Sequence, residues 1–169
     1  VGVSCVNALS VRLYVQVYRN GKIYEQEYSK GIPKYSVREA GVTDRTGTTV
    51  TFLPDPEIFP DTEYKYDILA SRLRELAFLN SGIALTLTDY RVENEGDAPK
   101  TERFYSENGL PEFVKYIDQS RSSIIPDVIY INTDKYGTPI EVAMTYNDSY
   151  TENIHSYVDK INTIEKDTH

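Results

Sequence analysis

The chain has 169 residues, enough for one domain or two small ones, and 26 acidic against 18 basic side chains give a net charge of −8. This negative charge repels polyanions, so the chain is not expected to clamp a DNA backbone itself. A hydrophobic content of 40% excludes disorder as the dominant state, and no run of about 18 apolar residues predicts a membrane span. The single cysteine, Cys5, excludes an internal disulfide and favours a reducing compartment. Because the sequence begins with Val1 instead of Met, we expect a piece of a longer protein.

The opening of the chain predicts a short helix followed by a β-hairpin. Small and apolar residues at 1–10 are typical of a glycine-containing loop that runs into a short helix. Apolar and polar residues then alternate over 11–19, which predicts a half-buried strand. Asn20-Gly21 is the dipeptide preferred in two-residue hairpin turns, so residues 22–28 are expected to pair back on that strand.

The middle of the chain predicts another strand and one clear helix. Residues 31–46 are expected to form a connection with a weak strand, and alternation over 48–53 predicts a stronger one. Residues 66–80 have helical periodicity, with Gly82 as the expected stop and a strand expected over 83–88. We expect this helix to pack on the sheet that contains strands 11–19 and 48–53. Its apolar side is made of Leu69, Leu73, Leu76 and Leu79. Arg72, Arg74 and Glu75 are expected to stay in water.

A polar stretch at 91–102 predicts a solvated loop, and we place a domain boundary there, near Lys100. Beyond it the pattern predicts a helix around 111–119 and a strand over 128–133. A turn at Tyr136-Gly137 and a strand that includes Ile140, Val142 and Met144 are expected to follow, and then a β-leaning segment at 153–164.

Motif spacing alone indicates little chemistry. The sequence contains no P-loop, no Cys-x-x-Cys, no His-Glu-x-x-His and no Gly-x-Ser-x-Gly pattern. Two histidines, His155 and His169, do not make a convincing metal site and are interpreted as surface or partly buried imidazoles.

Two polar residues stand at the ends of apolar strand faces. Parity places Arg19 on the face of Val11 to Val17, and Thr48 on the face of Val50 and Phe52. Strand ends that border a core are where pockets open, but spacing alone favours the interpretation of Arg19 as a cation beside a hairpin turn. Thr48 is likewise compatible with a turn residue that bonds nearby backbone, and Gly2 with an ordinary loop glycine.

Four blocks of sequence together resemble one protein family. They read VGVSCVNALS at 1–10, DRTGTTVTF at 44–52, RLRELAFLN at 72–80 and NDSYTEN at 147–153. This order is similar to the ATPase half of bacterial DNA gyrase B, part of a type IIA topoisomerase, and the resemblance spans essentially the whole chain. The stretch RELAFLN favours gyrase over the paralogous ATPase component of topoisomerase IV.

The resemblance implies an α+β or α/β sandwich fold in two parts. Residues 1–100 would be the C-terminal portion of a GHKL (Bergerat-type) ATP-binding domain. Residues 101–169 would be the N-terminal portion of a transducer domain similar to ribosomal protein S5 domain 2. The implied function is the ATP-operated gate of an ATP-dependent type II DNA topoisomerase, which couples hydrolysis to strand passage and negative supercoiling.

The resemblance also implies a nucleotide site at particular residues. The end of the family's ATP lid wraps the phosphates with backbone N–H groups, and such unpaired donors at a helix N-terminus favour anions. The family's adenine pocket includes an arginine at its mouth and a threonine that shares a water with an aspartate. The matching positions are Val1, Gly2 and Val3 in the lid, and Arg19, Thr48 and Val50 at the adenine pocket, with Val3 also lining it.

Other groups that the family uses match positions outside this chain. The general-base glutamate, the magnesium-binding asparagine and the adenine-binding aspartate would precede Val1, and the lysine that touches the γ-phosphate would follow His169. ATP and Mg²⁺ are therefore implied for the complete protein, no catalytic residue or metal ligand is expected here, and the chain alone is expected to be inactive. One departure is visible at 165–169, where EKDTH replaces the family's usual EGGTH.

The implied partners are ATP, DNA gyrase A, DNA through other domains, and a second copy of the ATPase region as a homodimer when ATP binds. The implied location is the bacterial cytoplasm, in association with the nucleoid and not with a membrane. The ATPase component of topoisomerase IV is one alternative. A non-catalytic, acidic, β-rich interaction domain is an alternative of another class, which composition alone allows.

Overall fold

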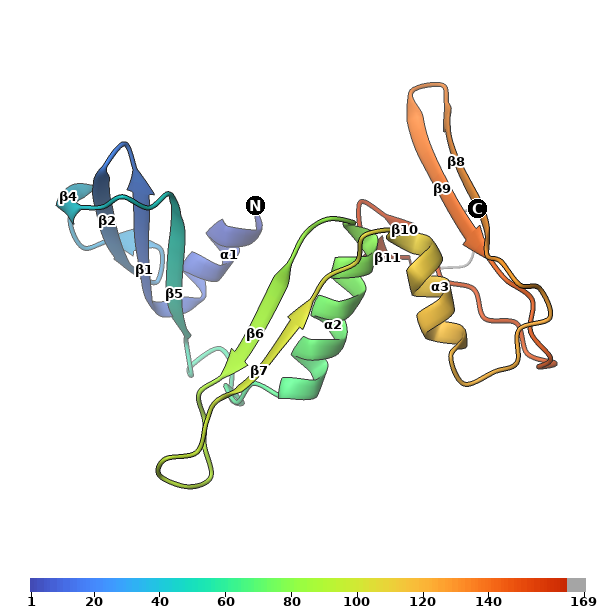
Figure 1. Cartoon of the computed structure of the whole chain (residues 1–169). Coiled ribbons are helices and arrows are strands. Elements are labelled where there is room, and N and C mark those ends of the chain that lie inside the picture. Colours follow the sequence, from blue (N-terminus) through green and yellow to red (C-terminus); the bar gives the residue numbers. More distant parts are fainter. Residues whose placement is uncertain (164–169) are drawn as a thin grey trace. The chain divides into compact units, whose positions relative to one another are not determined.

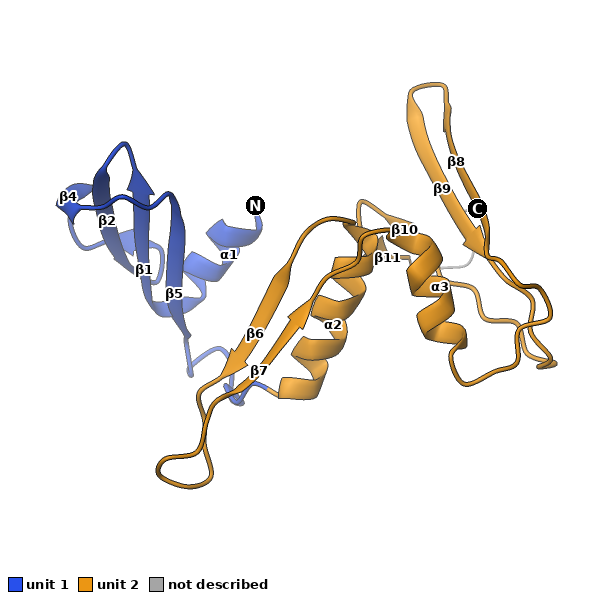
Figure 2. Cartoon of the chain, in the orientation of Figure 1, with its two compact units in different colours: residues 1–64 blue, residues 65–169 orange. Residues whose placement is uncertain are grey.

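The computed structural model describes residues 1–163. The chain divides into two compact units, Val1–Tyr64 and Lys65–His169 (Figure 2). The departure from the family pattern at 165–169, with His169, lies outside the described residues.

The first unit is an antiparallel sheet preceded by a short helix (Figure 1). The strands pair in the order β3-β2-β1-β5, and β4 pairs with β2. The tight turn between β1 and β2 is formed as expected, with φ of 54° at Asn20 and 74° at Gly21. The elements are α1 (Gly2–Ala8), β1 (Ser10–Arg19), β2 (Lys22–Ser29), β3 (Ile32–Pro33), β4 (Arg38–Val42) and β5 (Gly47–Pro54).

Buried residues of the first unit gather where α1, β1 and β5 meet. Leu13, in the middle of β1, is 2% exposed. Asp55, just after β5, is also buried, and it forms a salt bridge of 3.3 Å with Lys30. The backbone N–H of Asp55 donates to the Leu9 carbonyl, and that of Lys30 donates to the Ser10 carbonyl. These bonds fix the ends of three strands to the end of the helix.

One face of this sheet is covered by ion pairs. Glu25 accepts hydrogen bonds from the Tyr14 hydroxyl and, at 2.8 Å, from Arg38. Glu27 lies 2.7 Å from Lys34 and 3.0 Å from Arg12. The hydrogen bond from Tyr14 lowers the pKa of Glu25, and the hydrogen bond from Lys34 lowers that of Glu27.

These lowered pKa values predict a loss of stability in acid. A carboxylate whose folded pKa is depressed contributes stability above its unfolded pKa, and the contribution is lost as pH falls through the folded pKa. We expect the free energy of unfolding to decrease between about pH 5 and pH 3, and less steeply in the double variant Glu25→Gln, Glu27→Gln. Chemical unfolding at a series of pH values measures this slope. The variant Glu39→Gln, which removes an exposed partner of Lys22, is the control, and equal slopes in all three proteins would contradict the prediction.

Over residues 65–163, the second unit joins two helices to three separate strand pairs (Figure 1). β6 pairs with β7, β8 with β9, and β10 with β11, each antiparallel. The Tyr136-Gly137 turn is formed as expected, with positive φ at both residues. The elements are α2 (Tyr66–Leu79), β6 (Leu85–Asp89), β7 (Lys100–Phe104), α3 (Leu110–Asp118), β8 (Ile129–Lys135), β9 (Thr138–Met144), β10 (Tyr157–Val158) and β11 (Ile161–Asn162).

The long helix packs on elements of its own unit. Helix α2 contacts β6, β7 and α3, and its expected contact with the sheet of strands 11–19 and 48–53 stays a prediction. Its buried side includes Ala70 and Ala77, which pack against Phe104 of β7. Leu73 lies against this cluster, together with Leu85 and Leu87. The hairpin that follows the helix therefore supplies its apolar partner.

The loop before residue 100 is formed, but the compact units do not separate there. The polar stretch was expected to continue to 102, whereas β7 begins at Lys100 and pairs with β6. The cluster around Phe104 joins residues from both sides of Lys100, and the units divide at residue 64 instead. The assignment of 1–100 and 101–169 to two domains of the family stays a prediction, because it concerns longer domains than those present here.

Candidate nucleotide site

The strand register places the predicted adenine-pocket residues on one face of the first unit's sheet. Val17 of β1 lies opposite Thr48 of β5, and Val15 lies opposite Val50. Directly opposed residues in an antiparallel pair point to the same side, and so do residues two apart along a strand. Arg19 follows Val17 by two positions, so Arg19, Thr48 and Val50 share a face.

This shared face has a different chemistry from the ion-paired face behind it. Its side chains are mostly apolar, and Arg19 and Thr48 stand together at one end of β1 and β5. Both are exposed, and Val50 is 43% exposed. The described residues thus provide a cation, a hydroxyl and an apolar surface at one sheet end, open to a further component.

The residues matched to the ATP lid lie at the start of α1. Val1 precedes the helix and Gly2 is its first residue. Val1 and Val3 are both exposed, and the carbonyl of Val1 accepts the first intrahelical bond, from the N–H of Cys5 at 3.1 Å. The N–H groups of the first helical turn have no acceptor within the helix, which is compatible with the predicted role.

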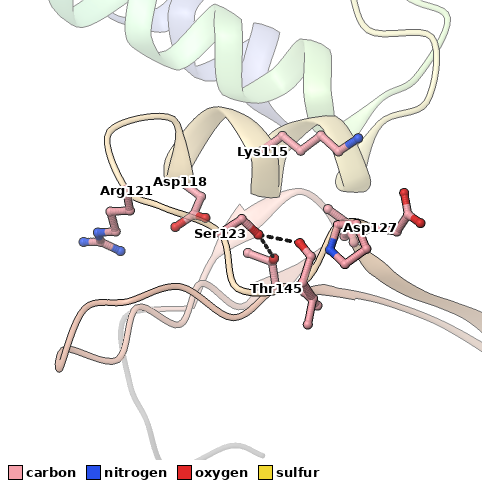
Figure 3. Close-up of a pocket in the computed structure, with 9 residues that line it drawn as sticks. Lys115, Asp118, Arg121, Ser123, Asp127 and Thr145 are labelled. Carbon is pink, nitrogen blue, oxygen red and sulfur yellow. Dashed lines mark hydrogen bonds between the residues drawn. The ribbon is translucent and has the colours of Figure 1, made fainter.

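A hollow in the second unit does not coincide with these residues. It has a volume of about 240 Å³ and lies between α3 and the segments that flank β8 and β9. Figure 3 shows the side chains of Lys115 and Arg121 pointing to opposite sides of it, while Ser123 bonds Thr145 across its floor. Because its charged groups do not converge, this hollow has no evident ligand chemistry.

The described part of the chain contains no cluster of metal-binding side chains. No group of three or more His, Cys, Asp or Glu side chains is close enough to hold a metal within residues 1–163. His155 is exposed and lies beside the ring of Phe113, at 6.2 Å between centroids.

Within residues 1–163, no helix combines the length and apolar character that a membrane crossing needs.

Comparison with known proteins assigns the family. The DNA gyrase B protein of Cytophaga hutchinsonii is 56% identical, and that of Staphylococcus aureus 42% identical, each over 100% of this chain. The DNA gyrase B family model matches residues 109–169. The chain belongs to the DNA gyrase B family. It spans 35% of the length of the Cytophaga hutchinsonii relative and 26% of that of the Staphylococcus aureus one.

A solved gyrase B structure has the same fold. The 43K ATPase domain of Thermus thermophilus gyrase B, in complex with an aminocoumarin, is 31% identical with a TM-score of 0.83. The likeness covers 95% of this chain and 43% of that one. The predicted GHKL-type fold of mixed α and β elements is therefore confirmed.

Sequence reasoning placed Arg74 in water, and the structure does not. Its side chain is 31% exposed and reaches from α2 to Glu102 of β7 and Tyr116 of α3. Helical periodicity could not reveal this, because the partners come from elements 28 and 42 residues further along the chain.

Proposed function

We propose that the chain is part of the ATP-operated gate of a DNA gyrase, an ATP-dependent type II topoisomerase that introduces negative supercoils. The observation that supports this most directly is the placement of Arg19, Thr48 and Val50 on one open sheet face, within a chain of the gyrase B family. An arginine at the rim, a hydroxyl and an apolar floor suit a flat, hydrogen-bonding base such as adenine.

Each residue has a distinct role in this proposal. Arg19 would lie along the bound nucleotide at the mouth of the pocket, because a planar guanidinium stacks on aromatic rings. Thr48 would hold the base through a shared water, and Val50 would contact its apolar face. Near the phosphates, the backbone N–H groups of Val1, Gly2 and Val3 would donate hydrogen bonds to the anion.

The remaining components belong to the complete protein. ATP with Mg²⁺ would be the cofactor pair, and no metal step is assigned to the residues of this chain. DNA gyrase A, a second ATPase region and DNA bound by other domains would be the partners, in the bacterial cytoplasm. Residues 1–100 would belong to the nucleotide-binding domain and 101–169 to the transducer.

The proposal is tested in the full-length protein combined with DNA gyrase A. We expect negative supercoiling of relaxed circular DNA that requires ATP. If the reconstituted enzyme relaxes or ignores DNA whatever nucleotide is present, the proposal is wrong. ATP-dependent decatenation without supercoiling would support topoisomerase IV, and nucleotide-independent association with another protein would support the acidic interaction domain.

The 169-residue chain alone is expected to release no phosphate from ATP. Hydrolysis needs a carboxylate to orient and deprotonate water, and positive charge on the transferred group. The family positions that supply these groups match nothing in this sequence. Phosphate release by the purified chain with ATP and magnesium, followed over hours against a buffer blank, measures it. Turnover that disappears in Arg19→Ala would show that the catalytic groups have been misplaced.

A further inference from the structure

Arg74 connects helix α2 with the two elements that follow the β6–β7 loop. Its guanidinium lies 3.4 Å from a carboxylate oxygen of Glu102 in β7 and 3.4 Å from the hydroxyl of Tyr116 in α3. It also lies over the rings of Phe104 and Tyr116, at 5.2 and 5.6 Å from their centroids. A planar guanidinium can ion-pair and stack at the same time, which an ammonium cannot do. One side chain therefore ties three elements together.

Aromatic stacking holds the same two helices together without Arg74. Phe78, one turn further along α2, stacks on Phe113 of α3 with 5.2 Å between ring centroids. The ring of Phe78 is also 5.4 Å from that of Tyr116. The helix pair thus keeps a packed contact when Arg74 is changed, so removal of the guanidinium is expected to loosen the junction without unfolding it.

Backbone contacts close the junction at the start of α3. The N–H of Gly82 donates to the carbonyl of Ser106 at 2.8 Å. Gly109, the residue before α3, has φ of +68°, and a Cβ there would lie 3.2 Å from the carbonyl oxygen of Phe78. The chain therefore passes from β7 into α3 in close contact with the end of α2. Within residues 1–163, Arg74 is the one charged side chain that ties all three of these elements together.

We propose that Arg74 is a positioning residue that holds α3 on α2 and β7, so that movement of the nucleotide-binding portion is transmitted to the part of the chain after residue 100. The inference rests on the proposed function. Arg74 precedes the predicted domain boundary near Lys100, whereas Glu102, Phe104 and Tyr116 all follow it. In the structure all four residues belong to one compact unit. A rigid contact among them makes the segments on either side of Lys100 move together, and a loose one lets the first move without the second.

The experiment uses the full-length protein reconstituted with DNA gyrase A and compares the unchanged protein with Arg74→Gln. Affinity for a non-hydrolysable ATP analogue should stay within about twofold, because Arg74 lies outside the predicted pocket. The number of supercoils introduced per ATP hydrolysed should fall about fivefold or more, the lower range of measured couplings between sites. Lower stability alone reduces hydrolysis and supercoiling together and leaves their ratio unchanged, so the ratio separates positioning from folding.

Three further variants make the result decisive. Arg103→Gln removes the same charge from an exposed position of β7 and should keep the normal ratio. Arg74→Lys keeps the charge but not the planar group, so its ratio should be intermediate. If Arg74→Gln does not fold, the number of supercoils per ATP hydrolysed is compared between the unchanged protein and the variants Arg74→Lys and Tyr116→Phe. If every Arg74 and Tyr116 variant introduces the normal number of supercoils per ATP hydrolysed, the inference is wrong but the proposed function stands. If the unchanged protein shows no ATP-dependent supercoiling, both the inference and the proposed function are wrong.

Discussion

Replacement of Phe104 by alanine is expected to lower the free energy of unfolding of the second unit by about 3–5 kcal/mol. Phe104 is 6% exposed and packs against Ala70 and Ala77 of α2. Its ring also lies under the guanidinium of Arg74. Two small alanines cannot fill the space that the ring would leave, so the cost includes a cavity as well as lost burial.

Urea unfolding followed by circular dichroism measures this cost. Tyr105→Ala is the matched control, because it removes a ring from the next residue, which is 47% exposed. That variant should lose no more than about 1 kcal/mol, since exposed positions tolerate substitution. Similar losses in both variants would mean that Phe104 does not occupy the core of this unit.

Replacement of Thr48 by alanine in the full-length protein is expected to weaken nucleotide binding by about 1–3 kcal/mol, the cost of leaving a buried polar group unpaired. Since 1.4 kcal/mol corresponds to a factor of ten, the dissociation constant should rise about 5- to 150-fold. The described residues leave Thr48 exposed, so the cost arises only when a nucleotide covers it. Folding itself should be nearly unaffected.

Isothermal titration with a non-hydrolysable ATP analogue tests this prediction. Thr49→Ala is the control, because Thr49 is the next residue of β5, lies opposite Gln16 and points to the other face of the sheet. Thr48→Ser keeps the hydroxyl and should bind almost normally. Unchanged affinity in Thr48→Ala, or an equal loss in Thr49→Ala, would favour the interpretation of Thr48 as a turn residue.

Local patterns were sufficient for the elements whose partners are near in sequence. Alternation over 11–19 and the Asn20-Gly21 turn fixed both the hairpin and its register, because a slip of one residue would turn every apolar side chain outward. Parity also placed Arg19 and Thr48 each on the apolar face of its own strand, but only the pairing of β5 with β1 brings these two faces to the same side of the sheet. The long helix ends at Leu79 with Asn80 as its C-cap, and Gly82, with φ of +83°, lies in the turn that follows, close to the predicted stop.

The polar composition of residues 91–102 predicted a loop where the structure has the start of strand β7. Lys100, Thr101 and Glu102 read as loop residues, yet they pair with residues 87–89 of β6. Side-chain charge does not prevent backbone pairing when one face of a hairpin remains in water. The residues on both sides of Lys100 therefore lie in one compact unit, and the domain assignment itself stays a prediction.

The sequence by itself determined the family, the order of the elements and the parity of the candidate nucleotide-binding residues, because each depends on residues close together along the chain. Only the tertiary structure decided that α2 packs on β6 and β7, and that Arg74 lies among Glu102, Phe104 and Tyr116. A helical pattern shows which side of a helix is apolar, but not which distant element covers it. An arginine at the edge of that apolar side has an aliphatic stem that can be buried and a charged head that needs a partner. Its position is therefore set by where the other elements place a carboxylate and an aromatic ring.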